Sequence, residues 1–496
     1  MNTLKGETVA VVGLAESGRA AARLALEKGG EVHVSDLRTD AATHARGAEL
    51  RKLGAEVDVG EHPIGRIVGA STVVVSPGVP PDAPVLIELR ERGIRWVSEP
   101  EFAFRFFDGP LIAVTGTNGK TTTAALVAHL LEEDGVDVAL GGNIGAAFGP
   151  AASELALREQ SPAWYVVEMS SFQLAAIDRF RPDIGVMTNL APDHLDRYSS
   201  VDSYYADKAN LFRNADDDSR WVLNGDDPAV VALAEGVPGR CFYFSGKDAG
   251  RSGGDDSRSG AYLDGDVLTL RMAGAGEGPS GSEAADGNEA LAGSEAIGEG
   301  LPGHDEVLGR VEDIPLLGSH NLENALAASI TARLAGVSTR SISRGLTTAR
   351  ALPHRTEWVA EANGVRWVND SKATNVAAAR SAICSLEGPL LVLLGGKDKG
   401  EDFSPLVAAL SETDASALAF GQAGTRIFET LHGQVPVELL DVGFDEVVEE
   451  AARRSASGTT VLLSPACSSY DMFENYEERG ARFAALARTL SAGADG

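Results

Sequence analysis

The stretch Leu-Ile-Ala-Val-Thr-Gly-Thr-Asn-Gly-Lys-Thr-Thr-Thr at residues 111–123 decides the fold. An apolar run of strand type breaks into a loop with two glycines, and residues 124–131 continue as an apolar helix. Glycine lets backbone N–H groups turn toward an anion, and a helix N-terminus adds positive partial charge. Lys120 can reach terminal phosphates, and the Thr121 hydroxyl can bind Mg²⁺. The stretch therefore predicts a nucleoside triphosphate site in an α/β domain.

The loop departs from the general phosphate-loop pattern at one position. That pattern places a glycine five residues before the glycine of Gly-Lys, where this chain has Val114. Residues 116–122 thus form a narrower signature. The alternative is an ordinary strand-to-helix turn with a surface lysine, which a glycine pair, a lysine and three threonines together disfavour.

The bulk composition limits the classes of function. A length of 496 residues suggests two to four domains, each able to bury its own core. The formal charge of −29 argues against a nucleic-acid or membrane-surface role, because both partners are anionic. We find no charged-then-apolar leader and no run of 18 apolar residues, and the three cysteines are scattered. We therefore expect a soluble cytoplasmic protein.

Residues 1–108 are expected to form a first, Rossmann-like domain. A buried-type strand, a glycine-containing turn and an alanine-rich helix precede a second strand that ends at Asp36. Ala15 stands where the dinucleotide fingerprint has its middle glycine, so NAD binding is not predicted. The turn, Asp36 and Arg38 could form a nucleotide or nucleotide-sugar site, or the unit could be plain α/β packing. A turn at Ser76–Gly78 ends another strand and favours a site.

The second domain carries polar residues where its predicted strands end. The apolar run Trp164–Glu168 ends in a carboxylate that can hold Mg²⁺ beside the phosphate loop, or that is merely an exposed strand end. After the next strand, His194 lies among carboxylates and could bind a metal or only a hydrogen-bonding neighbour. Lys208 falls on the apolar stripe of a helix. Its ammonium could extend past the stripe to water, or its amine could have a lowered pKa and react.

From about residue 246 to residue 306 the composition changes to Gly, Ser, Ala, Asp and Glu. The segment holds 13 acidic and 4 basic residues, with one predicted hairpin from 261–263 and 266–270. Because it offers few apolar residues for burial, residues 273–300 are expected to be a disordered surface loop. Order resumes at a helix whose start carries Asn321 and Asn324, a pair that could contact a base edge or cap the helix.

A linker at Leu352–Arg355 is expected to lead into a third domain. Asn363-Gly364 between two strand patterns predicts a hairpin. Strands and helices then alternate, and polar motifs follow three strands, at 370–375, 395–400 and 464–471. Because parallel strands end at one edge of a sheet, these motifs predict a ligand site on a second open α/β sheet.

In this order, the motifs resemble those of the Mur ligase family, over nearly the whole chain except the acidic insert. The family-wide features are residues 116–122, Glu168, the Asp193-His194-Leu195-Asp196 loop, Lys208, His320-Asn321 with Asn324, and His354-Arg355. The features of the D-glutamate-adding branch are Glu168–Leu174, Asn369–Asn375, Gly395–Lys399 and Ser464–Ala466.

The resemblance implies three α/β domains. They are a UDP-sugar-binding Rossmann-like domain at 1–108, a central phosphate-loop (P-loop) ATPase domain at 109–350, and a C-terminal Rossmann-like amino-acid-binding domain at 351–496. The implied reaction is ATP-dependent ligation of D-glutamate to UDP-N-acetylmuramoyl-L-alanine through an acyl phosphate, a cytoplasmic step of peptidoglycan precursor synthesis. The implied cofactors are ATP, two Mg²⁺ ions and a carbamylated Lys208. We expect a monomer that contacts neither nucleic acid nor membrane.

The resemblance also implies a role for each matching residue. The catalytic residues would be Lys120, Glu168, His194 and Lys208, and the metal ligands Thr121, Glu168, His194 and the Lys208 carbamate. ATP would contact Gly116, Thr117, Asn118, Gly119, Lys120, Thr121, Thr122, Asn321, Asn324, Arg355 and Asp370. The UDP substrate would contact Leu14, Ala15, Glu16, Asp36, Arg38, Ser76, Gly78, Asn143 and His194. D-Glutamate would contact Lys372, Thr374, Lys399, Ser469, Tyr470 and Tyr476. The two tyrosines stand where the family often has Leu and Phe.

Three other interpretations compete with this one. A sister ligase that adds another amino acid should differ around Asp370 and Lys399, where this chain keeps the D-glutamate motifs. A non-enzymatic nucleotide-dependent regulator would keep the phosphate loop, but would not need Lys208 together with the third-domain motifs. An oxidoreductase would use only residues 13–36 and would leave the rest of the chain unexplained.

Overall fold

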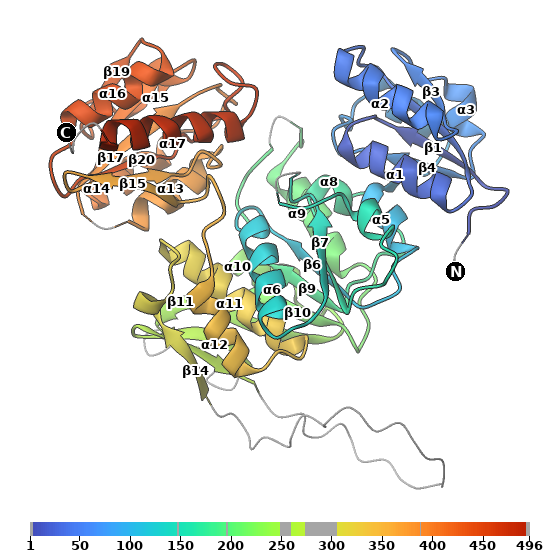
Figure 1. Ribbon diagram of the computed structural model, residues 1–496, viewed down its shortest axis with the longest axis horizontal. Helices are drawn as coiled ribbons and strands as arrows, with labels where there is room; N and C mark the ends of the chain where they lie inside the picture. Colours follow the sequence, from blue (N-terminus) through green and yellow to red (C-terminus); the bar gives the residue numbers. More distant parts are fainter. Residues whose placement is uncertain are drawn as a thin grey trace, which may run out of the picture.

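The computed structural model describes residues 3–145, 148–194, 197–248, 259–272, 305–386 and 388–492. Figure 1 shows three α/β lobes, with the blue N-terminal lobe and the orange-red C-terminal lobe on opposite sides of the central lobe. Each lobe has its own β-sheet, so the predicted α/β class with three domains is confirmed. Residues 273–300, expected as a loop, lie outside the described residues. Within the described ranges, no helix combines the length and the apolar character needed to cross a membrane.

The first lobe is a five-stranded parallel sheet in the order β3-β2-β1-β4-β5. This is a Rossmann-type order, in which the turn after β1 lies at the switch point between β2 and β4. The strands are β1 Thr8–Val12, β2 Glu31–Asp36, β3 Glu56–Val59, β4 Thr72–Val75 and β5 Val97–Ser98. The helices are α1 Glu16–Glu27, α2 Ala41–Lys52, α3 Ile64–Val68, α4 Pro84–Glu91 and α5 Glu99–Phe104.

The central sheet has the strand order β14-β13-β12-β11-β10-β9-β6-β8-β7. Strand β6 lies between β8 and β9, parallel to both, so the carboxyl ends of these three strands are neighbours. Its strands are β6 Leu111–Thr115, β7 Val138–Gly142, β8 Trp164–Glu168, β9 Ile184–Met187, β10 Arg220–Asn224, β11 Arg240–Asp248, β12 Gly260–Asp264, β13 Val267–Arg271 and β14 Asp305–Arg310. The predicted hairpin within the acidic segment is confirmed as antiparallel β12 and β13.

Helices of the central lobe cover the sheet and carry the phosphate loop. The α-helices are α6 Lys120–Glu133, α7 Ala152–Leu155, α8 Ser171–Leu174, α9 Val201–Ala209, α10 Pro228–Leu233, α11 Ser319–Leu334 and α12 Thr339–Thr348. Two short 3₁₀ helices are η1 Asn210–Phe212 and η2 Val311–Asp313. Buried side chains of α6 and α11 join those of β6, β8 and β9 in one apolar cluster.

The C-terminal sheet has the order β15-β16-β20-β17-β18-β19, with only β15 antiparallel to its neighbour. Asn363 and Gly364 both have positive φ, 53° and 74°, which confirms the predicted hairpin between β15 and β16. The strands are β15 Glu357–Ala362, β16 Val365–Asn369, β17 Leu390–Gly395, β18 Ser416–Phe420, β19 Val437–Leu440 and β20 Thr460–Leu463. The helices are α13 Val376–Cys384, α14 Pro405–Glu412, α15 Gly424–Leu431, α16 Phe444–Arg454 and α17 Tyr476–Ala492.

The first and central lobes share a hydrophobic core. One cluster of buried residues runs from Val9 of β1 through Phe102 of α5 to Leu111 of β6 and Tyr165 of β8. Phe107 stacks on Tyr165 with the ring centroids 4.0 Å apart. The C-terminal lobe instead buries its own two clusters on the faces of its sheet. The first and central lobes also each bury a cluster of their own, so each domain has its own core and the first two share a further one.

Helix α5 brings two carboxylates into this shared core. Glu101 accepts hydrogen bonds from the backbone N–H groups of residues 178–180. Glu99 is fully buried and accepts a hydrogen bond from the Ser153 N–H at the start of α7. Burial raises the pKa of Glu99 to about 7, although its hydrogen bonds with Ser153 oppose the rise. Glu99 therefore ionises in the folded protein only near neutral pH.

We expect this carboxyl group to make folding pH-dependent. Because its folded pKa lies above its ordinary value, Glu99 stabilises the fold fully below pH about 4.5, and this contribution is lost as the pH rises through about 7. Glu99→Gln keeps an acceptor for the Ser153 N–H and does not ionise. It should therefore be more stable than the wild type by about 3 kcal/mol at pH 8 and nearly equal to it at pH 4.5.

Urea unfolding of both proteins at the two pH values measures this difference. Glu91→Gln changes an exposed glutamate at the end of α4 and serves as the control. An identical pH dependence of the unfolding free energy in the wild type and Glu99→Gln would contradict the assignment.

Candidate active site

A cavity of about 490 Å³ is lined by residues of both the central and the C-terminal lobes. It contains most of the residues that the sequence assigned to ATP, catalysis and the amino acid. From the central lobe these are Thr117, Asn118, Gly119, Lys120, Thr121, Thr122, Asn143, Glu168, His194, Asn321 and Asn324. From the C-terminal lobe they are Arg355, Asp370, Lys372, Thr374 and Lys399. The fold thus brings together motifs that are more than 200 residues apart in the sequence.

The phosphate loop owes its shape to Gly116 and Gly119. Both have positive φ, 139° and 81°, in the turn between β6 and α6. A Cβ atom on Gly116 would lie 1.9 Å from the Thr188 Oγ1, and one on Gly119 would lie 2.3 Å from the Asn324 Oδ1. Any other residue at either position would clash. The glycines therefore let the loop fold tightly against β9 and α11 at the start of a helix, where an anion is favoured.

Lys120 is the first residue of α6 and faces the cavity. Its Nζ donates to the Thr117 carbonyl at 2.7 Å, within the same loop. Burial lowers the pKa of Lys120, whereas the negative charges of Glu168 and Asp193 oppose that shift. The amine is therefore held beside the loop. A terminal phosphate of a bound nucleotide would add further negative charge near this amine.

Glu168 at the end of β8 presents oxygen ligands beside the loop. The Thr121 hydroxyl donates to its Oε2 at 2.7 Å, and the Asn143 Nδ2 donates to its Oε1 at 3.3 Å. Arg355 donates from its Nη2 to the Thr121 Oγ1 at 2.6 Å. Carboxylate and hydroxyl oxygens near phosphate oxygens suit Mg²⁺, which keeps several of its waters. No group of three or more His, Cys, Asp or Glu side chains arranged for a metal occurs in the described residues.

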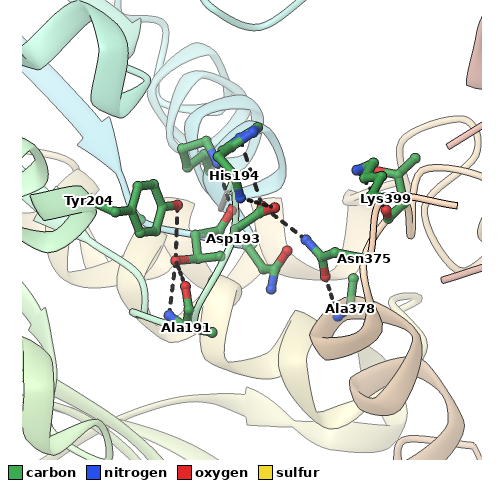
Figure 2. A network of polar contacts seen from close by, with 12 residues as sticks. Ala191, Asp193, His194, Tyr204, Asn375, Ala378 and Lys399 are labelled. Atoms are coloured by element: carbon green, nitrogen blue, oxygen red, sulfur yellow. Dashed lines mark hydrogen bonds and ion pairs between the residues drawn. The ribbon is translucent and has the colours of Figure 1, made fainter. Parts of the chain in front are cut away.

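His194 lies on the loop after β9 with a positive φ of 55°. Its ring meets Phe172 edge-on, with the centroids 5.3 Å apart, and lines the same cavity as Glu168. The neighbouring Asp193 accepts a hydrogen bond at its Oδ1 from the His194 N–H. Figure 2 shows this loop between the phosphate-loop side and the C-terminal lobe. His194 is therefore near the candidate Mg²⁺ residues, although its nitrogen is a less usual ligand for that ion.

Lys208 on α9 lies behind the phosphate loop. Its side chain is 1% exposed, and its Nζ donates to the Gly116 carbonyl at 2.6 Å. The amine also lies 4.8 Å from the ring centroid of Tyr204. Burial, and then the nearby positive charge of Lys120, lower the pKa of Lys208 far below its ordinary value. The side chain thus does not extend to water, and the lowered pKa favours its uncharged form.

Asn321 and Asn324 connect the start of α11 to the phosphate loop. Asn324 donates to the Asn321 Oδ1 at 3.2 Å and accepts from the Thr123 hydroxyl at 3.1 Å. Asp370 lies across the cavity and accepts from the Ser464 hydroxyl at 2.8 Å and from the Thr356 N–H at 3.1 Å. Burial raises the pKa of Asp370 to about 7. These residues enclose the volume next to the loop from both lobes.

The residues assigned to D-glutamate follow the carboxyl ends of strands in the C-terminal sheet. Lys399 donates from its Nζ to the Thr374 carbonyl at 2.8 Å. Lys372 lies 3.8 Å from the ring centroid of Tyr476, and burial, then Arg355, lower its pKa to about 7. Ser469 and Tyr470, the latter 66% exposed, do not line the cavity.

The residues assigned to the UDP moiety form a separate group in the first lobe. They are Leu14, Ala15, Glu16, Asp36, Arg38, Ser76 and Gly78, whereas Asn143 and His194 line the main cavity. A Cβ on Gly13 would lie 2.8 Å from the Ser76 Cβ, so the first turn packs against the end of β4. The buried Ser76 Oγ has no hydrogen-bond partner among the described residues. It lies at the switch point of the sheet, the place where open α/β sheets bind ligands.

Asp36 supports the same turn from the end of β2. Its Oδ2 accepts from the Leu14 N–H at 2.6 Å, and its carboxylate pairs with Arg38. Burial opposes ionisation, but the hydrogen bonds from Arg38 and Leu14 outweigh it and hold the pKa of Asp36 below its ordinary value. Asp36 therefore shapes the turn and orients Arg38.

Sequence reasoning missed residues that hold the site from behind. Thr188 and Asn189 bind the backbone of Asn118, through the Asn118 carbonyl and N–H respectively. Arg479, which is fully buried, donates to the carbonyls of Ser371 and Cys467 at 2.9 and 3.1 Å. It therefore connects the loops after β16 and β20. The available signal was that Arg479 falls four residues before Phe483 on the buried face of α17.

Three protein-family models match this chain. They are "Mur ligase MurD-like, N-terminal domain" over residues 7–98, "Mur ligase middle domain" over residues 114–262, and "Mur ligase, glutamate ligase domain" over residues 354–467. The three matches follow the order of the three lobes.

Relatives and solved structures agree with these matches. A protein of Acidobacterium capsulatum named UDP-N-acetylmuramoylalanine--D-glutamate ligase is 40% identical over 97% of this chain and 96% of its own length. A protein of the same name from Geobacillus kaustophilus is 36% identical over 95% of each chain. The crystal structure of MurC from Thermotoga maritima, a UDP-N-acetylmuramate-alanine ligase, matches with a TM-score of 0.55 at 17% identity, over 97% of this chain and 99% of its own. At that identity the likeness concerns the fold alone.

Proposed function

The chain belongs to the Mur ligase family, and from this premise we propose that it ligates D-glutamate to UDP-N-acetylmuramoyl-L-alanine with hydrolysis of ATP to ADP and phosphate. The reaction is a step of peptidoglycan precursor synthesis. The observation that carries the proposal is the cavity that is lined both by the phosphate loop and by residues of the D-glutamate motifs, namely Asp370, Lys372, Thr374, Asn375 and Lys399.

The reaction proceeds in two steps. A carboxylate is a poor electrophile, so an oxygen of the alanyl carboxylate first attacks the γ-phosphorus of ATP, the bond to the bridging oxygen breaks, and ADP leaves. The amine of D-glutamate then attacks the carbonyl carbon of the acyl phosphate, the nitrogen loses a proton, and phosphate leaves as the C–O bond breaks. Phosphoryl transfer requires mainly positioning and neutralisation of charge. Lys120 supplies a cation to the transferring group, and the loop N–H groups hold the other phosphate oxygens.

Glu168 and the Thr121 hydroxyl are the residues that would hold Mg²⁺, with Asn143 orienting the carboxylate. A Mg²⁺ ion held there would supply positive charge to the phosphate oxygens. When a nucleotide binds, Arg355 would exchange its contact with Thr121 for phosphate oxygens, because both are acceptors within its reach. His194 is placed to contact the acyl group or a second ion.

Lys208 is proposed to carry a carbamate. Burial lowers the pKa of this amine well below its ordinary value, which favours the uncharged form that can attack CO₂. The N–C bond forms as one C=O bond of CO₂ opens, and the amine releases a proton. The product would be an anion whose oxygens could serve as ligands for a second Mg²⁺.

The two substrates enter from opposite lobes. The UDP moiety would occupy the first-lobe turn at Leu14–Glu16, with Ser76 and Arg38 at its sides and the sugar directed toward Asn143 and His194. D-Glutamate would place its carboxylates at Lys399 and Thr374, with Lys372 nearby. We propose that the protein acts in the cytoplasm as a monomer and contacts neither nucleic acid nor membrane.

One assay tests this function. Purified protein is given MgATP and UDP-N-acetylmuramoyl-L-alanine, and ADP release is measured separately with D-Glu, L-Glu, L-Ala and a diamino acid. Sustained ADP release with an amide product is expected for D-Glu alone. A preference for the diamino acid would identify a sister ligase, and no product with any of the four would overturn the ligase assignment.

Lys399→Ala should raise the KM for D-Glu about tenfold or more while leaving the KM for ATP nearly unchanged. The variant removes a charge-assisted partner of a substrate carboxylate, but leaves the phosphate loop intact. Lys397→Ala is the matched control, because this exposed lysine lies two residues earlier and does not line the cavity. If the KM for ATP rises and that for D-Glu does not, the assignment of the amino-acid site is wrong.

A further inference from the structure

Asn375 joins the central and C-terminal lobes at the cavity. Its Nδ2 donates to the Asp193 Oδ2 at 3.1 Å, across 182 residues of sequence. Its Oδ1 accepts from the Ala378 N–H at 2.7 Å and so caps α13. Figure 2 shows the amide between Asp193 and Ala378, with Lys399 on the same side of the cavity. Both ends of this side chain, which is only 5% exposed, are therefore in use.

The two contacts fix which end of the amide faces which partner. A backbone N–H requires an acceptor, so the oxygen must face Ala378, and the NH₂ group must face the carboxylate. Capping by itself does not require asparagine, because aspartate caps as well and also interacts favourably with the helix dipole. An aspartate here would place a second carboxylate against Asp193. The donor, and not the cap, is thus the feature that distinguishes Asn375.

The two linked loops carry groups for the two halves of the reaction. Asp193 also accepts from the His194 N–H at 2.8 Å, and its charge favours the protonated forms of Lys120 and Lys208. On the other side, Thr374 directly precedes Asn375 and accepts from Lys399 through its carbonyl. The hydrogen bond therefore connects the loop at the acyl-phosphate side with the loop proposed to bind D-glutamate.

We propose that Asn375 is a positioning residue that holds the D-glutamate loop in register with the His194 loop, so that the amine of the amino acid meets the acyl phosphate. The inference rests on the proposed function. Asn375 acts through Asp193 and Thr374 and need not contact any substrate itself. Its loss should impair the second step, the attack by the amine, and leave the phosphoryl transfer of the first step intact.

Asn375→Asp is the test, because it preserves the cap and replaces the donor by a like charge. We expect kcat/KM for D-Glu to fall about ten- to hundredfold, the range of a lost hydrogen bond to a charged group. The KM values for ATP and UDP-N-acetylmuramoyl-L-alanine should stay within about twofold, as should the rate of acyl-phosphate formation, measured without D-Glu by trapping with hydroxylamine. The Tm should stay within a few degrees, since Asp and Asn cap equally well.

Two outcomes would overturn the inference. One is a wild-type kcat/KM for D-Glu in Asn375→Asp. The other is a rise of all three KM values together with a lowered Tm, a result that would indicate a structural role only. If Asn375→Asp is insoluble, Asn375→Ser carries the same test, because serine also caps but is too short to reach Asp193. The wild type is assayed first. Absence of an amide product from the wild type with D-Glu would refute the proposed function, whereas unaffected D-Glu kinetics in the variants refute only the positioning role.

Discussion

Lys120→Ala is expected to lower kcat for amide formation by about 10²- to 10³-fold or more at saturating ATP. Lys120 is the cation at the start of α6 that faces the cavity beside Glu168. Removing one preorganised charge contact to a transferring group typically costs about 3–4 kcal/mol in the transition state. Acyl-phosphate formation without D-Glu should fall by the same factor, because the lysine acts in the first step.

Two comparisons make this result specific. Lys52→Ala removes an exposed lysine at the end of α2, and turnover should not change. Lys120→Ala should also retain its melting temperature within a few degrees, since the lost contact to the Thr117 carbonyl is a single hydrogen bond. Near-normal turnover of Lys120→Ala at saturating ATP would mean that the phosphoryl group is transferred elsewhere.

The sequence was sufficient to predict the local parts of this site. The phosphate loop, Glu168 and the Asp370–Asn375 motif each follow directly after an apolar run, so both the strand and its polar end are visible within a dozen residues. The glycines at 116 and 119 were also informative, because the turn needs positive φ there. The confirmed hairpin at Asn363-Gly364 belongs to the same class of short-range signal.

The contacts between lobes could not be predicted in this way. Arg355 reaches Thr121 across 234 residues, and Asn375 reaches Asp193 across 182. Both pairs depend on how the sheets of two lobes are placed relative to each other. The spacing of apolar residues within one segment does not encode that placement. The shared core of the first and central lobes was missed for the same reason, since Phe102 and Tyr165 look like ordinary core residues in either domain. Arg479 was missed because the sequence does not reveal which carbonyls surround a buried guanidinium.

Lys208 is the second position at which we expect a large loss. If the amine only filled the core, Lys208→Met would be mild, since methionine keeps an unbranched apolar side chain in the space above Tyr204. If the amine is carbamylated, the working side chain is an anion, and Lys208→Met, Lys208→Arg and Lys208→Ala should all lose nearly all activity. Lys208→Arg should do so because it brings a fixed positive charge toward Lys120 and the proposed Mg²⁺ residues.

A small carboxylate separates the carbamate from other roles of Lys208. Acetate or formate can occupy the space emptied in Lys208→Ala and supply the oxygens that a carbamate would have provided, so partial recovery of turnover is expected. The same anions should not restore Lys120→Ala, which lacks a cation and not an anion. A complementary readout is mass spectrometry of the intact wild type under CO₂, where an added mass of about one CO₂ should be absent from Lys208→Met. Wild-type turnover of Lys208→Arg would refute the carbamate, because guanidinium does not form one at neutral pH and its charge is opposite.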